Sequence, residues 1–217
     1  FLSAEFLKGG HMSRSGLMYT RAAERSTQRD GKWMRGVVCL FLFVLVVYGG
    51  YRSAWFEETY RFPFPYRPLV ETYAASRELD PMLVAAVIQA ESKFKPQAVS
   101  NQGARGLMQM MPETAQWVAH NIGEETFFEE HLNEPETNIR FGTWYLASLK
   151  EEFHGNEVLM LAAYNGGRGT VRQWMTTYGW NFSFQDVKAI PYGETREYVE
   201  RVLSGRERYR QLYGNKG

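Results

Sequence analysis

Apolar residues at helical spacing dominate the chain from residue 69 onward, and the clearest case lies between Asp80 and Pro112. Asp80 is a favourable N-cap residue, and Pro81 suits the first position of a helix. The stripe that follows has the i, i+3, i+4, i+7 spacing of one buried helix face, with Leu83, Val84, Val87 and Ile88. The last member of this predicted stripe is a carboxylate, Glu91.

The position of Glu91 indicates chemistry as well as packing. Burial disfavours the charged form of a carboxylate, so we expect a raised pKa and a protonated Glu91 near neutral pH. A general acid is built in this way. The alternative is a structural Glu that ends the helix and pairs with Arg105 or Lys93. No further acidic residue lies between Glu91 and Pro112.

The same spacing predicts helices throughout the C-terminal part of the chain. Their expected spans are a helix starting at Leu69, Pro112–Ile122, Pro135–Phe153, Val158–Tyr164, Thr170–Tyr178 and Glu194–Tyr213. The sequence shows no convincing alternating strand pattern and no internal repeat. We therefore predict an all-α domain of about 150 residues, over residues 68–213.

A different pattern precedes this domain. Twelve strongly apolar residues, Val37–Tyr48, have arginines and aromatic residues on both sides. With these flanks the run approaches one bilayer crossing, so we predict a transmembrane anchor over residues 36–56. A cleaved signal peptide and a buried core helix are the alternatives, but no clean cleavage site follows and the flanks do not suit a core.

The remaining N-terminal segments complete the predicted organisation. Residues 1–11 end in Gly-Gly-His-Met and are interpreted as vector-derived or disordered. Residues 12–35 are expected to form a disordered basic arm, which the positive-inside rule assigns to the cytoplasm. The chain would then cross the cell membrane once, with the large domain extracytoplasmic. Residues 57–67 are predicted to be a stiff, extended Pro/aromatic linker that holds this domain off the bilayer.

Composition narrows the function classes. The net charge of +1 and the absence of a basic stripe in the C-terminal part argue against a nucleic-acid partner. The single cysteine, Cys39, lies in the apolar run, and the four histidines are scattered, so we expect no metal site. No cofactor is expected, and the sequence carries no signal for an oligomeric state. No lipobox cysteine is apparent, so the expected anchor is the helix and not a lipid.

Four sequence blocks occur in one order along the predicted domain. They are Ala90-Glu91-Ser92, Gly106-Leu107-Met108-Gln109 with Pro112, Ala163-Tyr164-Asn165-Gly166-Gly167, and Ile190-Pro191-Tyr192 running into Glu194-Thr195-Arg196-Glu197-Tyr198-Val199. Together they closely resemble the catalytic domain of the soluble-type lytic transglycosylases, the goose-lysozyme-like family that cleaves peptidoglycan. The resemblance covers roughly residues 66–213 and implies a lysozyme-like helical fold.

The resemblance also implies a mechanism with Glu91 as the only catalytic carboxylate. Glu91 would protonate the glycosidic oxygen between N-acetylmuramic acid and N-acetylglucosamine in the glycan strands. The 2-acetamido group of the substrate would support the oxocarbenium-like centre, where ordinary glycosidases use a second carboxylate. Glu91 would then take the proton of the muramoyl 6-hydroxyl, and a 1,6-anhydro product would form without water.

Further site residues are implied by the same resemblance. Ser100 would bind near the acetamido group, although a turn-capping serine is the structural alternative. Gln109 and the backbone of Gly106, Leu107 and Met108 would line the sugar cleft. Met108 would stack on a sugar face, unless it packs in the core as methionines at such junctions more often do.

The last two blocks imply the other wall of the cleft. Tyr164 would hold its hydroxyl near the catalytic carboxyl, and Asn165 would shape the cleft. Glu194 would fix the wall by hydrogen bonding, or form a plain ion pair with Arg196 or Arg201, and Tyr198 lies one turn further. Three more aromatic residues could be sugar platforms but more often belong to a core: Trp174, Trp180 and Phe182.

Two other functions remain open from the sequence. A goose-type lysozyme-like hydrolase would need a second acid across the cleft, for which the candidates are Glu113, Glu129 and Glu194. A catalytically inactive wall-binding scaffold would have no need for a protonated buried carboxyl, and the intact set of motif residues argues against it.

Overall fold

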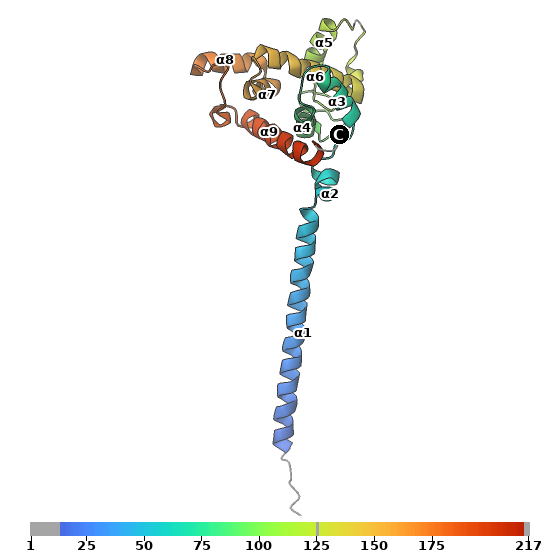
Figure 1. Ribbon diagram of the computed structural model, residues 1–217, viewed down its shortest axis with the longest axis vertical. Helices are drawn as coiled ribbons and strands as arrows, with labels where there is room; N and C mark the ends of the chain where they lie inside the picture. Colours follow the sequence, from blue (N-terminus) through green and yellow to red (C-terminus); the bar gives the residue numbers. More distant parts are fainter. Residues whose placement is uncertain (1–13, 125, 215–217) are drawn as a thin grey trace, which may run out of the picture. The chain divides into compact units, whose positions relative to one another are not determined.

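The computed structural model describes residues 14–124 and 126–214, with side chains from Trp33 onward (Figure 1). The chain divides into two compact units between Ser53 and Ala54. The interpretation of residues 1–11 lies outside the described residues.

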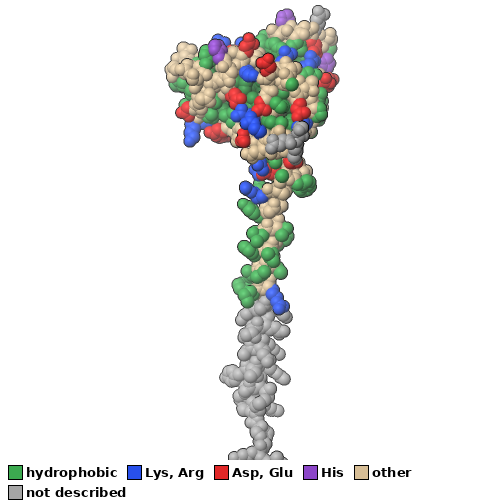
Figure 2. All heavy atoms as spheres, viewed as in Figure 1, with side chains coloured by type: hydrophobic (Ala, Val, Ile, Leu, Met, Phe, Trp, Pro, Cys, Tyr) green, Lys and Arg blue, Asp and Glu red, His purple; other side chains and the backbone are tan. Residues whose placement is uncertain are grey.

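In its described residues the first unit consists of one helix, α1 (Arg14–Tyr51). Among the described residues, its stretch Trp33–Tyr51 is the one that is long and apolar enough to cross a membrane. The hydrophobic side chains of this stretch are exposed, as Figure 2 shows in green. A helix of 19 residues spans about 28 Å, close to the thickness of a bilayer core.

The prediction of a disordered arm at residues 12–35 differs from this backbone, which is helical from Arg14. The arm contains no proline and many residues of good helix propensity, so the helix of the apolar run can propagate backwards through it. Adding a residue to an existing helix avoids the cost of nucleation. The composition of the arm alone does not show that a helix is already present next to it.

The second unit begins with α2 (Ala54–Phe56) and a five-residue π-helix, η1 (Glu57–Arg61). The Glu57 side chain is buried and forms an ion pair with Arg208 near the end of the chain. This contact ties the start of the unit to its last helix.

The next residues also pack on the domain. The Tyr209 hydroxyl donates to the carbonyl of Pro63 at 2.9 Å, and the Tyr213 hydroxyl donates to that of Phe62 at 2.9 Å. The Phe64 ring lies against both tyrosines. The prediction that residues 57–67 form an extended linker, separate from the domain, is therefore wrong. The prolines keep the path irregular, but the aromatic residues between them bury apolar surface against the C-terminal helix.

The rest of the second unit is helical, which confirms the all-α prediction. Its elements are α3 (Arg67–Ala75), α4 (Pro81–Ser92), α5 (Pro112–Asn121), η2 (Glu129–Asn133), α6 (Pro135–Glu152), α7 (Glu157–Gly166), α8 (Arg168–Tyr178), η3 (Val187–Ala189) and α9 (Gly193–Tyr213). Within the described residues the β-structure consists of two isolated bridges, Val99 with Arg105 and Arg105 with Met110.

Helix α4 occupies the centre of the domain, and Figure 1 shows it close to α9 and α3. Its N-terminus is capped as predicted, since the Asp80 carboxylate accepts from the Met82 N–H at 2.8 Å. Residues 82–88 are all buried, because a helix that is apolar on every face must be covered on every face. Each fully buried Val, Leu or Ile contributes about 1.5–3 kcal/mol. Gly205 of α9 faces Ala86 of α4, and a Cβ there would only reach ordinary van der Waals contact with it, at 3.4 Å.

A smaller apolar cluster supports the other side of the domain. It lies between α5, η2 and α6 and consists of Met110, Ala115, Val118, Ala119, Leu132 and Phe141. The loop between α4 and α5 therefore has a packed core on both sides. The last turn of α4 and this loop form the floor of the pocket described next.

Candidate active site

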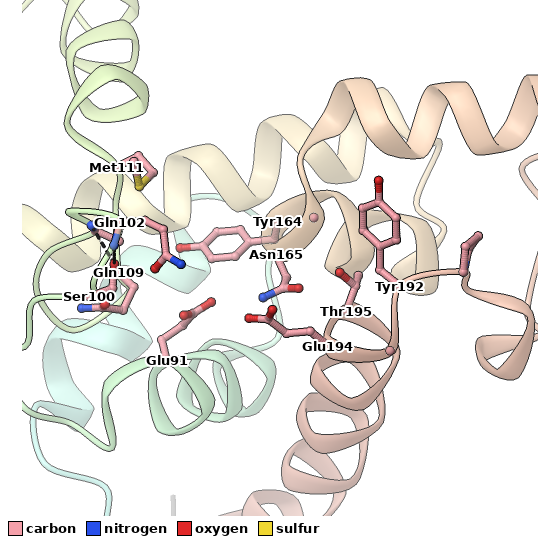
Figure 3. A pocket seen from close by; sticks show the side chains of 14 residues that line it. Glu91, Ser100, Gln102, Gln109, Met111, Tyr164, Asn165, Tyr192, Glu194 and Thr195 are labelled. Carbon is pink, nitrogen blue, oxygen red and sulfur yellow. Dashed lines mark hydrogen bonds between the residues drawn. The ribbon is translucent and has the colours of Figure 1, made fainter.

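A pocket of about 830 Å³ opens where four segments of the domain meet (Figure 3). The segments are the end of α4, the loop over residues 100–111, the end of α7 and the start of α9. Glu91 lies on the floor of this pocket, and Glu194 extends from α9 toward the same space. Both carboxylates thus share one cavity.

Glu91 has the electrostatic character that its place in the apolar stripe predicts. The side chain is half-buried in the last turn of α4, and burial raises the pKa of its carboxyl to about 7. The Tyr198 hydroxyl and the Arg201 guanidinium lower that pKa, since both favour the carboxylate, and the Glu194 carboxylate raises it. Within the described residues no lysine or arginine forms a salt bridge with Glu91, so the pairing with Arg105 or Lys93 is not observed.

Tyr198 lies behind Glu91 on α9 and is itself only 1% exposed. Its hydroxyl lies beside the Glu91 carboxyl but makes no hydrogen bond of standard geometry among the described residues. Burial raises the pKa of the Tyr198 hydroxyl well above 10, so it remains a donor at any physiological pH. Tyr198 does not line the pocket; it supports the residue that does.

Ser100 and Gln109 line the pocket from the loop. The Ser100 hydroxyl accepts from the N–H groups of Gln102 and Ala104, so it caps the turn as well as facing the cavity. The Gln109 side-chain amide donates to the carbonyls of Ala98 at 3.1 Å and Gly106 at 2.9 Å. These bonds occupy the amide nitrogen and fix the side chain across the loop.

The loop is held by Asn138 of α6, a fully buried polar residue. Its amide nitrogen donates to the carbonyls of Arg105 and Leu132, each at 2.9 Å, and its oxygen accepts from the Met108 N–H at 2.7 Å. Gly106 has φ +78° beside this amide, and a Cβ there would collide with Asn138 and with the Leu132 carbonyl. Glycine is therefore required on two counts at this position.

Three predicted cleft residues do not reach the pocket: Gly106, Leu107 and Met108. Met108 is fully buried and packs against Gly142 of α6, and Gly106 is also buried. The main-chain carbonyl of Met108 accepts from the Tyr164 hydroxyl at 2.8 Å, and that of Leu107 accepts from Ser92 at 2.7 Å. The structure therefore corrects the roles expected for Gly106, Leu107 and Met108: they shape the loop and do not face the cavity.

Tyr164 and Asn165 end α7 and line the pocket above Glu91 (Figure 3). The Tyr164 hydroxyl is directed to the loop, as its bond to Met108 shows, and its ring packs on Tyr145 with centroids 5.6 Å apart. Asn165 directs its amide into the space between Glu91 and Glu194. The break at Gly167, with φ +88°, ends α7 just beyond these residues.

The three candidates for a second acid are separated by the fold. Glu194 is exposed and lines the pocket, so the buried ion pair considered for it is not observed. Glu113 lines a different cavity. Glu129 pairs with Arg105 at 3.5 Å outside the pocket. Glu194 is thus the candidate that shares the cavity of Glu91.

Sequence reasoning missed several residues that line the pocket, among them Gln102, Met111, Tyr192 and Thr195. Tyr192 is the most prominent, because it is 57% exposed and rests edge-on against Trp174 at 5.0 Å. Its position inside the fourth sequence block was a usable signal. The three aromatic residues considered as platforms do not line this pocket: Trp174, Trp180 and Phe182.

The pocket offers few side chains that could bind a metal ion or a cofactor. The described residues contain no group of three or more His, Cys, Asp or Glu side chains close enough to hold a metal ion. The pocket instead offers carboxylates, amides and hydroxyls around one half-buried acid. Such an arrangement suits recognition of a polar, uncharged substrate and proton transfer to it.

Fold and pocket together define a helical, lysozyme-like domain with one acid on the floor of its cleft. The chain belongs to the Transglycosylase SLT domain family, whose sequence profile matches residues 68–185.

Two named relatives illustrate the family. The chain is 37% identical over 158 residues to the soluble lytic murein transglycosylase of Escherichia coli K12, covering 72% of this chain and 24% of the relative. It is 31% identical over 174 residues to the membrane-bound lytic murein transglycosylase C of Yersinia pestis (strain Pestoides F), covering 67% of this chain and 47% of the relative. The chain thus spans about a quarter of the length of the first relative.

Solved structures of lytic transglycosylases have the same fold as this domain. The 70 kDa soluble lytic transglycosylase of Escherichia coli superposes with a TM-score of 0.67 at 36% identity, covering 74% of this chain and 26% of that one. An inactive glutamate-to-glutamine mutant of the lytic transglycosylase Slt from Pseudomonas aeruginosa gives a TM-score of 0.66 at 36% identity, with 72% and 26% covered. The lysozyme-like transglycosylase fold expected from the sequence is confirmed.

Proposed function

We propose that this chain is a peptidoglycan lytic transglycosylase that cleaves the β-1,4 bond between N-acetylmuramic acid and N-acetylglucosamine without water. The observation that carries the proposal is Glu91, an acid with a pKa of about 7 on the floor of a polar pocket. Membership of the SLT domain family supports the reaction class. Near neutral pH about half of such a group is protonated, which suits a residue that must both give and take a proton.

In the first step the Glu91 carboxyl gives its proton to the glycosidic oxygen, and the bond from that oxygen to C1 of the muramoyl residue breaks. The electron deficiency at C1 is met by the 2-acetamido oxygen of the same sugar. In the second step the Glu91 carboxylate removes the proton of the 6-hydroxyl, O6 bonds to C1, and the acetamido oxygen leaves C1, which restores the neutral acetamide. Glu91 ends protonated, as it began, and the 1,6-anhydro product contains no added water.

The surrounding residues have distinct proposed roles. Ser100, Gln109 and Asn165 offer polar groups along the walls for the hydroxyl and acetamido groups of the sugars. Tyr198 lies beside the Glu91 carboxyl and lowers its pKa. Tyr164, bonded to the Met108 carbonyl, locks the loop against α7. Gly106 and Met108 act through the shape of this loop and not by contact.

Glu194 supports one alternative function, a hydrolase, because it lies across the same pocket from Glu91. With Glu194 as the base for a water molecule the domain would be a lysozyme-like hydrolase, and the product would have a reducing end. A wall-binding scaffold is less compatible with a half-buried acid whose charged form is disfavoured.

Mass spectrometry of the muropeptides released from purified peptidoglycan tests the proposal. The full chain in detergent is expected to release products one water lighter than those of a lysozyme digest. The same assay with Glu91→Gln should release none. Products with a reducing end would identify the hydrolase, and binding without release would identify the scaffold.

We further propose that Trp33–Tyr51 anchors the chain as a single transmembrane helix, with its N-terminus in the cytoplasm and the second unit extracytoplasmic. The length and composition of this segment support it, as does the similarity to a relative named membrane-bound. The arginines before the span favour this orientation. Protease added to intact spheroplasts should digest the second unit; protection of that unit would reverse the topology.

A further inference from the structure

Two exposed aromatic residues at the start of the second unit have no role in the mechanism above. Trp55 is 67% exposed and Tyr60 is 64% exposed, both more than Phe128 at 58%. Their rings meet edge-on with centroids 6.0 Å apart, and the Phe56 ring lies 5.1 Å from that of Tyr60. We call Trp55, Phe56 and Tyr60 the aromatic foot. Apolar rings that cluster on a surface, unlike single exposed residues, indicate an interaction site.

The π-helical turn of η1 brings these rings to one face. The Phe62 N–H donates to the Glu57 carbonyl at 2.7 Å, which is the five-residue bond of such a turn. In an α-helix, residues five apart would point about 140° away from each other. The wider turn closes this angle, so the rings of Trp55 and Tyr60 touch. π-helical turns are rare, and they occur frequently at functional sites.

The aromatic foot is fixed to the second unit. Glu57, the residue after Phe56, is buried and forms an ion pair with Arg208 of α9. The side-chain amide of Gln89, on α4, donates to the carbonyl of Arg61 at 2.8 Å. The turn that carries the foot is therefore held by α9 and by α4. A surface that binds the foot also holds the domain.

The aromatic foot follows the proposed membrane anchor directly in the chain. The candidate span ends at Tyr51, and Trp55 comes four residues later. Four residues reach at most about 14 Å, even when fully extended. In a chain anchored by this span, the headgroup layer of the bilayer therefore lies within reach of the foot. Such a tether gives the contact a high effective concentration.

The chemistry of the foot favours a lipid interface over a protein. Trp and Tyr combine an apolar ring with a polar N–H or O–H, and they are enriched at the level of the lipid headgroups. Each such side chain buries about 150–250 Å². Trp55 and Tyr60 together thus offer much less than the roughly 1,000 Å² that a stable protein interface buries. A tethered contact with lipid needs no such area, because the anchor already supplies proximity.

Charge does not supply the attraction. The η1 turn contains two acidic residues, Glu57 and Glu58, and one arginine, Arg61. A basic patch that binds acidic headgroups needs several lysines or arginines. Arg61 is instead paired with Glu57 at 3.4 Å. We therefore expect a contact made by aromatic side chains, with little dependence on salt or on the share of anionic lipid.

We propose that the aromatic foot inserts into the headgroup layer of the membrane and seats the second unit on the bilayer surface. The partner is the interface of a phospholipid bilayer, bound by aromatic rings and not by charge. The inference rests on the proposed membrane anchor, because it assumes a span that ends at Tyr51. It is independent of the reaction proposed for Glu91.

Tryptophan emission from the full chain in vesicles tests the proposal. The vesicles consist of phosphatidylcholine, or of phosphatidylcholine brominated on the upper acyl chain, which quenches an indole at the headgroup boundary. Trp55→Phe keeps a ring and gives the background of the other tryptophans. The emission of Trp55, which is the difference between the parent and this variant, should lose most of its intensity in brominated lipid. The loss should be equal at low and high salt.

Two further variants move the indole within the Trp55→Phe background. Tyr60→Trp places it on the other exposed ring of the foot and should be quenched as Trp55 is. Phe128→Trp is the matched control, because Phe128 is also exposed but precedes η2, which packs with α5 at the opposite end of the second unit from α2 (Figure 1). Its emission should not change. Quenching of Trp55 without quenching of the Tyr60→Trp variant would mean that sequence proximity to the span is the cause, and would overturn the proposal.

Flotation of the vesicles separates failure of this inference from failure of the anchor. A chain that floats with the vesicles after a carbonate wash, with no quenching at either position, would keep the anchor and reject the foot. Emission shielded from aqueous iodide but unaffected by brominated lipid would assign the foot to a protein, such as a second copy of this chain, and would also overturn the proposal. A chain that does not float would reject anchor and foot together, while anhydromuropeptides released by it would keep the proposed enzyme.

Discussion

Two glutamates in the same domain, one buried and one half-buried, have opposite surroundings. Glu57 is 6% exposed and is enclosed by Arg208 and Arg61, which form ion pairs with it. Glu91 is half-buried and, within the described residues, has a tyrosine hydroxyl beside it but no cationic partner in contact. The first is the pattern of a structural carboxylate and the second that of an acid. Burial alone does not distinguish them; the partner does.

The largest expected effect is on activity, at Glu91. Glu91→Gln keeps the shape of the side chain and removes its proton, so the release of anhydromuropeptides should fall about a thousandfold or more. Glu57→Gln is the matched control with the same chemical change, and its activity per folded molecule should equal that of the parent. Substantial release by Glu91→Gln would assign the acid elsewhere.

The next effect is on stability, at Glu57. Glu57→Gln removes the anionic partner of Arg208, which keeps, within the described residues, only its hydrogen bond to Gln211, and should lower the free energy of unfolding by about 2 kcal/mol. This is less than for a fully enclosed pair, because the Arg208 side chain is 34% exposed. Urea unfolding of the full chain measures the change. An unchanged midpoint would mean that the junction between η1 and α9 contributes nothing to the domain.

Glu91→Gln should act on stability in the opposite direction, and only above the pKa of an unfolded glutamate. The folded pKa of about 7 exceeds that of an unfolded Glu, so the folded state holds an extra proton between those values and loses stability as pH rises through them. Above pH 7 the parent carries this cost in full and the glutamine variant does not. A gain of about 1–3 kcal/mol at pH 8, absent at pH 4, is expected from unfolding curves.

The smallest effects are shifts of the pH profile. Activity should fall as pH rises above about 7, where Glu91 loses its proton. Arg201→Gln removes a charge that favours the carboxylate, so it should move this decline to higher pH, as should Tyr198→Phe. Glu194→Gln should move it to lower pH. Each shift is expected to be about half a unit, measured from kcat/KM against pH. Shifts of the reverse sign would contradict the electrostatic assignment of these neighbours.

Local patterns in the sequence predict many of the helices of this molecule and the position of its candidate acid. Asp80, Pro81 and the apolar spacing after them specify α4, and Pro112, Pro135 and Gly167 place other helix ends where they are observed. Glu91 is conspicuous because it completes an apolar stripe, and both helix periodicity and burial are properties of neighbouring residues.

Long-range contacts decided the rest. Residues 57–66 look like a linker because their partners, Arg208, Tyr209 and Tyr213, lie about 150 positions away. The sequence motif suggests that Met108 faces the cleft. In the structure its side chain packs in the core, because Gly142 of α6 leaves room for it there. Asn138, which holds the loop, belongs to no motif block that the sequence offered.

The sequence by itself determined the helices of the domain, the family and the candidate acid, because helix spacing is local and the family motifs are read in order along the chain. Tertiary structure alone decided which carboxylate has a partner and which loop residues face the cavity. Those properties depend on which distant side chains meet, and the free energy of such contacts is not encoded in any single stretch of the chain.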